Sequence, residues 1–200
     1  MDLFFLLALA LIASQLLRGP QRQRTALLAR ALAPYQIERL MESLIEGYLR
    51  AMGEAGGERR QQSLDFLHIS ETQLAEQFTQ FAAAFGQLPA QQTLVSRLPI
   101  ALPLLARLFP ASGFDMRRLL DVHAQGIARA ARNDAGLSPR DKAFTMTAEL
   151  LLMQHSCHWF CKSHLVASAR VLARHQSTHA QIVAAVSPQT RRDYLALVSR

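Results

Sequence analysis

The chain has 200 residues, of which 50% are hydrophobic and 18% are charged, and its formal net charge is +7 at neutral pH. A chain of this size and composition can bury a substantial core, and one folded domain is expected. Aromatic residues amount to only 7% and the arginines are scattered, which argues against a nucleic-acid surface built on base stacking. The two cysteines are too few for a disulfide framework, so we expect reduced thiols in a cytoplasmic setting.

Residues 1–19 are predicted to be a membrane anchor, because residues 3–17 are almost entirely apolar. Such a run extends roughly 22 Å as a helix, which is short for a bilayer core of about 30 Å. The only charged side chain before it is Asp2, whereas a cleaved signal peptide begins with a positive region. Arginines follow from Arg18 on, so the positive-inside rule places the N-terminus outside and the remainder in the cytoplasm. The prediction is a single-pass protein of a bacterial inner (cytoplasmic) membrane, with a signal peptide and a buried or interfacial helix as alternatives.

Residues 20–34 form a basic, amphipathic segment in which arginines alternate with alanine and leucine. One interpretation is a juxtamembrane helix that lies along the membrane surface. The alternative is the first helix of the folded domain, ended by Pro34.

Residues 35–200 are predicted to form an all-α helical bundle, because apolar residues recur at helical spacing and alternating strand patterns are missing. The clearest amphipathic helix extends from Tyr35 to Gly53. A short helical piece is expected at 58–67, and the capping-box sequence at 70–73 is expected to open a separate helix. That helix carries an apolar stripe typical of a core contact, which comprises Leu74, Phe78, Phe81 and Phe85.

The apolar stretch at 98–110 contains three prolines and cannot form one regular helix. It is interpreted as a buried connector, with contact to the membrane or to a partner as the alternative. Capping residues at 112–115 then predict a helix to about Arg132, with His123 in the middle of its apolar face.

The longest predicted helix begins at Ser138 with Pro139 at its first position and continues to Gln176, and the bundle is expected to surround it. Two short helices, capped by Thr178 and Ser187, complete the chain.

The middle of this long helix holds both cysteines, the only tryptophan and three of the seven histidines. At about 100° per residue, Cys157, Cys161 and His164 share one face, whereas His155 points nearly opposite. Thiolate and imidazole are zinc ligands in tetrahedral sites, so these three residues are the candidate metal ligands. A fourth ligand, or a water, would have to come from a neighbouring element.

His123 is a poor candidate for that fourth position. Antiparallel folding about Gly136 would place it beside about residue 149, roughly 12 Å from Cys157 along the helix. The histidines that the sequence leaves unplaced are His68, His175 and His179. The alternatives to a metal site are cysteines that pack in the core as small apolar residues, or cysteines with redox or nucleophilic chemistry.

The leading functional prediction is a non-catalytic, membrane-tethered helical module that scaffolds or regulates a protein partner at the cytoplasmic face. No phosphate-binding loop, HExxH motif or catalytic triad is seen, which favours a role without catalysis and without a cofactor. The sequence identifies no small-molecule substrate. The second prediction is a metal-binding protein or metalloenzyme that holds zinc on Cys157, Cys161 and His164. The third is a basic bundle that binds nucleic acid, which the sparse aromatic residues disfavour.

Overall fold

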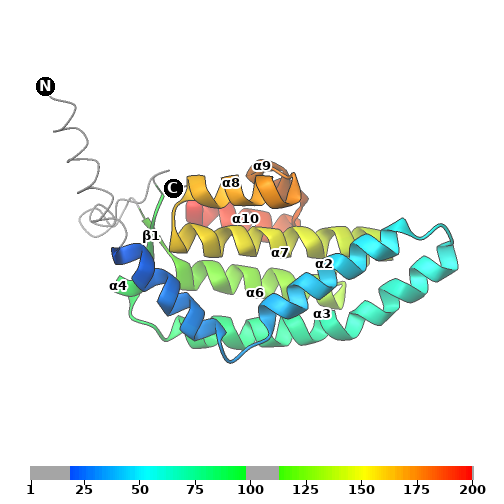
Figure 1. Cartoon of the computed structure of the whole chain (residues 1–200), viewed down its shortest axis with the longest axis horizontal. Coiled ribbons are helices and arrows are strands. Elements are labelled where there is room, and N and C mark those ends of the chain that lie inside the picture. The colour runs from blue at the N-terminus through cyan, green and yellow to red at the C-terminus, as the bar shows by residue number, and fades with distance from the viewer. Residues whose placement is uncertain (1–18, 98–112, 200) are drawn as a thin grey trace, which may run out of the picture.

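The computed structural model describes residues 19–97 and 113–199. Helices dominate this part of the chain and pack into a bundle, so the predicted all-α class is confirmed (Figure 1). After a helical segment at 19–32, the elements in chain order are α2 (Ile37–Gly53), α3 (Gly57–Gly86), α4 (Ala90–Thr93), β1 (Leu94–Ser96), β2 (Gly113–Asp115), α6 (Met116–Arg132), α7 (Pro139–Cys161), α8 (His164–His175), α9 (His179–Ala185) and α10 (Pro188–Val198).

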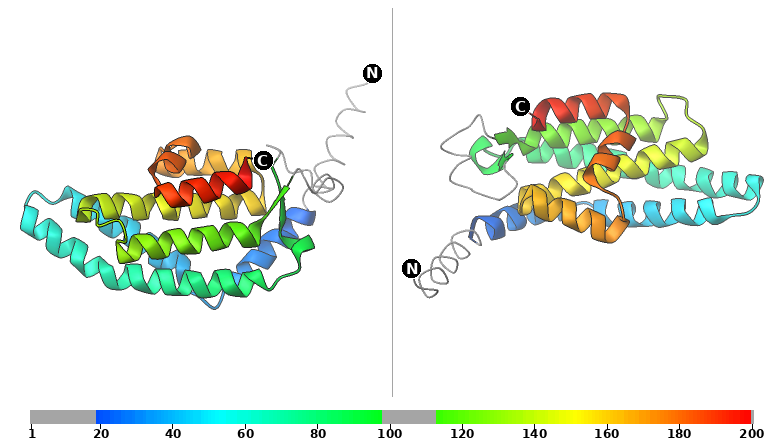
Figure 2. Two further views of the ribbon diagram at one scale, coloured as in Figure 1. Left: turned by 180° about the vertical axis from the view of Figure 1, so that it is seen from behind. Right: turned by 90° about the horizontal axis from the view of Figure 1, so that it is seen from above.

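Helix α7 lies inside the bundle. Helix α6 packs between α3 and α7, and α2 and α3 form a hairpin that extends beyond one end of the molecule (Figure 2). Helices α8 and α9 cover the other side of α7, and α10 packs against α6. The run Leu150–Met153 on α7 is buried on every side, as its all-round apolar sequence predicts.

Aromatic residues of α3 form much of the core. Phe78, Phe81 and Phe85 are fully buried, which confirms the predicted stripe. The ring of Phe85 meets that of Phe160 on α7 edge to face, with centroids 5.8 Å apart. Edge-to-face pairs of this kind favour one fixed arrangement of the helices that carry them.

Helix α7 ends at Cys161, so the prediction of one continuous helix from Ser138 to Gln176 is wrong. Lys162 leaves the helical conformation with φ −128° and ψ −90°, and the Ser163 side chain then accepts a hydrogen bond from the Val166 N–H. A serine that caps a new helix breaks the old one without any change in the apolar pattern on either side.

Helix α3 is also continuous where two helices were predicted. The sequence at 70–73 matches a capping box, but these residues lie inside the 30-residue helix. Thr72 donates its hydroxyl hydrogen to the carbonyl of His68 one turn earlier, at 3.0 Å. This back-bonding is what a threonine in a helix interior does, and it leaves no open helix end for a cap.

A two-stranded antiparallel sheet, which the sequence pattern does not predict, pairs Leu94 with Asp115 and Val95 with Phe114. Each strand has only three residues, too few for a visible alternation. The sheet packs on the end of α7, where the Trp159 indole N–H donates to the Ser96 carbonyl at 3.0 Å.

The predicted anchor at 1–19, apart from its last residue, and the proline-rich stretch at 98–110 lie outside the described residues. Among the helices that are described, none combines the length and apolar character that a membrane span needs. The helical segment 19–32 packs on the bundle through buried Leu28, and the Arg24 guanidinium lies 5.6 Å from the centre of the Phe160 ring.

Candidate metal centre

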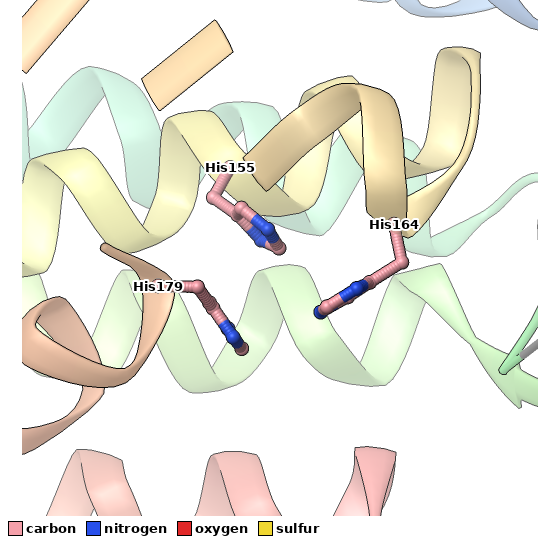
Figure 3. A group of neighbouring side chains, drawn as sticks. All are labelled: His155, His164 and His179. Atoms are coloured by element: carbon pink, nitrogen blue, oxygen red, sulfur yellow. The ribbon is translucent and has the colours of Figure 1, made fainter. Parts of the chain in front are cut away.

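Three histidines from three helices converge beside α7 (Figure 3). His155 lies on α7, His164 is the first residue of α8, and His179 is the first residue of α9. One ring nitrogen of each lies within 4.8 Å of those of the other two. Over residues 19–97 and 113–199, these are the only three His, Cys, Asp or Glu side chains grouped closely enough to share a metal ion. We call this group the histidine triad.

Helix caps fix the positions of two members of the triad. Ser163 caps α8 directly before His164. Thr178, directly before His179, forms a reciprocal capping box with Gln181. Each cap satisfies backbone N–H groups that a helix start would otherwise leave open, so the start of the helix is well defined. Both histidines are therefore presented by ordered helix termini.

The rings of the triad contact one another. Those of His155 and His179 are stacked, with centroids 4.2 Å apart and planes inclined by 17°. The His164 ring stands edge-on to both, at 5.1 and 5.0 Å. Trp159 closes one side, with its ring 4.6 Å from that of His164. The triad is thus a cluster of touching rings with the Trp159 indole on one side.

Two hydroxyl groups hold the rings from outside. The Nε2 atom of His155 lies 3.0 Å from the Ser168 hydroxyl, and the Nε2 atom of His179 lies 2.9 Å from the Tyr194 hydroxyl. The other nitrogen of His155, Nδ1, is buried and has no hydrogen-bond partner. A buried polar atom without a partner is costly, and a ligand at this nitrogen would remove that cost.

Burial keeps the triad uncharged at neutral pH. Burial, assisted by the neighbouring histidines, lowers the pKa of His155 to about 2. Burial and the proximity of His164 lower the pKa of His179 to about 4, and burial also lowers the pKa of His164. Neutral imidazole is the form that binds a metal ion, so the three lone pairs do not have to be freed from protons at pH 7.

Of the three residues predicted from sequence as metal ligands, the structure brings only His164 into the triad. Cys157 and Cys161 are half-buried free thiols one turn apart on α7. The Cys157 sulfur lies 3.9 Å from that of Met153. Burial raises the pKa of both thiols, which disfavours reactive thiolates. Metal binding by the two cysteines stays a prediction.

His155 is the member that sequence reasoning excludes, because on one continuous helix it faces away from His164. The break at Lys162 turns α8 back along α7 and removes this objection. The only sequence signal for the break is Ser163, which can cap a helix. His179, which the sequence leaves unplaced, completes the triad.

The remaining predicted donors lie elsewhere. His175 bonds the Gln154 side chain at 3.2 Å, and His68 lies beside Glu71. His123 is buried, as predicted, but its Nε2 atom lies 2.9 Å from the Ser156 hydroxyl, so the expected neighbour near residue 149 is wrong. The turn between α6 and α7 does include Gly136, but the bond to Ser156 places the His123 ring about two turns further along α7 than expected.

A second polar cluster lies between α2, α3 and α7. The buried Glu71 carboxylate accepts hydrogen bonds from the Tyr48 hydroxyl, at 2.5 Å, and from the Lys142 ammonium. These residues line a cavity of about 200 Å³ that His68 and Leu137 also border. The Glu71 carboxylate is satisfied by its neighbours, so the cluster fits a structural lock between the three helices.

No family model, curated protein or solved structure matches this chain.

Proposed function

We propose that this chain is a metal-binding protein that holds one transition-metal ion on His155, His164 and His179. One observation carries the proposal: a nitrogen from each of three imidazoles lies within 4.8 Å of the others. Imidazole groups in a protein interior usually satisfy each nitrogen with a hydroxyl, a carbonyl or a metal.

The ligand type selects the metal class. Three uncharged nitrogen ligands without a carboxylate suit zinc, copper, nickel or iron, and they disfavour calcium and magnesium, which prefer oxygen. Three protein ligands leave a tetrahedral ion one further position for a water or another small ligand. The half-buried rings of His164 and His179 leave the triad near the surface, where such a ligand could enter.

Binding requires a small adjustment of the rings. A tetrahedral zinc ion with bonds of about 2.0–2.1 Å holds its nitrogen ligands roughly 3.4 Å apart, so the triad must contract. The stacked rings of His155 and His179 must also tilt relative to each other, because a metal ion lies in the plane of each imidazole that binds it. The bound ion would then cross-link α7, α8 and α9.

Metal titration tests this proposal. The chain should be purified without chelator, stripped, and titrated with Co²⁺ and Zn²⁺, with the bound metal quantified by elemental analysis. Trp159 is the only tryptophan and contacts His164, so its fluorescence should report Co²⁺ binding directly. We expect one ion per chain in the wild type. Less than about a tenth of an equivalent at neutral pH would refute the proposal.

A matched pair of variants locates the ion. His164→Ala removes a triad member at the start of α8 and should abolish stoichiometric binding. His175→Ala removes a histidine at the end of the same helix, whose ring bonds Gln154 and lies outside the triad, and should bind as the wild type does. Equal binding by both variants would show that the ion sits elsewhere.

A membrane-tethered scaffold is the second candidate function, and exposed apolar side chains of the α2–α3 hairpin support it. Leu49, Phe66 and Ile69 are 70%, 80% and 66% exposed. Large apolar groups left in water favour a partner surface. Deletion of residues 1–19 should release the protein from membranes into the soluble fraction. If the full-length chain is itself soluble after cell lysis, the tether is refuted.

A further inference from the structure

Helix α8 has an apolar outer surface. It lies on the outside of the bundle and packs on α7 and α9 (Figure 1). Ala167 and Val171 are buried in that contact. A helix that buries one side in this way ordinarily presents polar side chains on the opposite side. Five apolar residues of α8 are exposed instead, and we call them the α8 face: Leu165, Val166, Ala169, Leu172 and Ala173.

Two leucines dominate the α8 face. Leu165 is 62% exposed and Leu172 is 50% exposed. They are seven residues apart, which is about two helical turns, so both lie on the same side of the helix. Ala169 lies between them. Apolar side chains that are grouped on a surface in this way mark a site of contact with a partner or a membrane.

Helix α8 itself carries only positive charges. Arg170 and Arg174 are exposed, and the helix contains no acidic residue. The Arg174–Glu42 ion pair is more than half exposed on both sides, so a surface anion can replace Glu42 at little cost. Leucines beside arginines are typical of a helix that lies in the interface of an anionic membrane. A second copy of the chain would bring the same arginines and the same net charge of +7, which disfavours self-association.

The start of α8 lies beside the point at which the predicted anchor joins the described residues. Lys162 comes directly before the cap of α8, and its ammonium donates to the side-chain oxygen of Gln21 at 3.4 Å. Gln21 follows Gly19, the first described residue, by two positions. Residues 1–19 are the part of the chain that the sequence predicts to enter a membrane. A bilayer that receives them would therefore lie near the start of α8.

We infer that the α8 face binds the surface of an anionic lipid bilayer, with Leu165 and Leu172 among the lipid headgroups and Arg170 and Arg174 on lipid phosphates. The leucines gain free energy by leaving water. Each arginine near a negative membrane surface strengthens binding about 5-fold. The proposed metal ion would lie between α7, α8 and α9, on the other side of α8, so the two proposals can fail independently.

A tryptophan placed on the α8 face tests the contact in the full-length chain. Leu172→Trp is mixed with phosphatidylcholine vesicles that contain about 30 mol% phosphatidylserine, with and without brominated acyl chains, which quench tryptophan on contact. The emission of buried Trp159 is measured in the wild type and subtracted. Its emission should shift to the blue and be quenched by the brominated lipid.

Phe66→Trp is the matched control. Phe66 on α3 is 80% exposed, more than Leu172, but it follows the exposed acidic residue Asp65 and lies outside α8. Its tryptophan should not be quenched. An anchor at 1–19 would hold both variants on the vesicle, so a difference between them reports contact by α8 itself.

The charge requirement is tested in the Leu172→Trp background. Arg170→Gln with Arg174→Gln should weaken the contact roughly 25-fold, measured as quenching against lipid concentration. Arg50→Gln with Arg118→Gln removes two exposed arginines outside α8 and should leave the quenching unchanged. Vesicles of phosphatidylcholine alone should quench the Leu172→Trp variant much less.

Four outcomes would overturn the inference. The first is no quenching of a tryptophan at 172, and the second is equal quenching at 172 and 66, which would mean general adsorption. The third is equal quenching by neutral and anionic vesicles. The fourth is a blue shift at 172 that grows with protein concentration without lipid, since a second copy would then cover the face. If Leu172→Trp does not fold, Leu165→Trp provides the same measurement.

Discussion

Gly126 on α6 lies so close to the Glu149 carboxylate on α7 that a Cβ atom at position 126 would overlap it. The same Cβ would lie 2.5 Å from the Thr190 hydroxyl. The carboxylate accepts the backbone N–H of Ser187, the cap of α10, at 3.1 Å, and burial raises its pKa. Gly126 thus makes room for the buried contact that joins α6, α7 and α10.

Replacement of Gly126 by alanine should therefore destabilise the protein. Helix propensity alone would favour alanine over glycine by up to about 1 kcal/mol. The overlap with Glu149 acts in the opposite direction and should dominate, with a net loss of about 1–3 kcal/mol in the free energy of unfolding. Urea unfolding followed by circular dichroism measures this. Gly86→Ala is the control, because a Cβ at that last residue of α3 meets nothing within 4 Å; a Gly126→Ala variant as stable as Gly86→Ala would contradict the prediction.

The Glu71–Lys142 pair should show strong coupling in a double-mutant cycle. The two side chains are only 3% and 15% exposed, so removal of either partner leaves a charge with little access to water. We expect Lys142→Met to cost about 3 kcal/mol or more. The double variant Glu71→Leu, Lys142→Met should be less destabilised than the sum of the single variants, by about 1–3 kcal/mol.

The Glu42–Arg174 pair provides the comparison for this cycle. Its side chains are 56% and 60% exposed, although their N–O distance is a good 3.0 Å. Solvent screening should limit its coupling to less than about 1 kcal/mol. Equal coupling energies for the two pairs would show that burial is not the source of the effect.

Helix caps can be predicted from the sequence more reliably than contacts between distant segments. Ser138, Thr178 and Ser187 were predicted as caps, and each accepts a backbone N–H in the structure. A cap depends on a side chain and a backbone group three residues away, so the sequence contains all of it. The pairing of Leu94–Ser96 with Gly113–Asp115 depends on segments far apart in the chain, and no such local rule applies.

The histidine triad could be predicted only in part, less well than the helix caps and better than the strand pairing. The sequence singles out His164 and leaves His179 as an unplaced donor, but it assigns His155 to the wrong face because the helix is assumed to continue. A helical wheel is reliable only within one helix. The turn between α7 and α8 brings together rings whose spacing along the chain carries no metal-binding motif.

Substitution by glycine should have opposite effects on stability at two residues that have left-handed backbone conformations. Gln176, with φ 52°, is exposed and ends α8, so Gln176→Gly should relieve strain and stabilise the protein by about 0.5–1 kcal/mol. Asn133, with φ 57°, uses its amide to bond both the N–H and the carbonyl of Leu137, each at 2.9 Å. Asn133→Gly should lose about 1–2 kcal/mol with these bonds. Thermal unfolding of both variants measures the difference, and changes of the same sign would contradict it.

The stability of the chain should fall in acid partly because of His123. This histidine is fully buried, and burial lowers its pKa to about 3, whereas an exposed histidine has a pKa near 6.5. Below pH 6.5 the unfolded chain takes up a proton at His123 that the folded chain excludes, so the stability is complete above pH 6.5 and declines until about pH 3. Between pH 7.5 and pH 5 this one group should lower the free energy of unfolding by about 2 kcal/mol.

The variant His123→Gln tests this, because glutamine keeps a donor for Ser156 but cannot titrate. Its free energy of unfolding, measured with urea in chelator-containing buffer, should decrease by about 2 kcal/mol less than that of the wild type over the same pH range. Because all other groups are unchanged, parallel pH profiles for the wild type and this variant would mean that His123 is protonated in the folded state or solvated there.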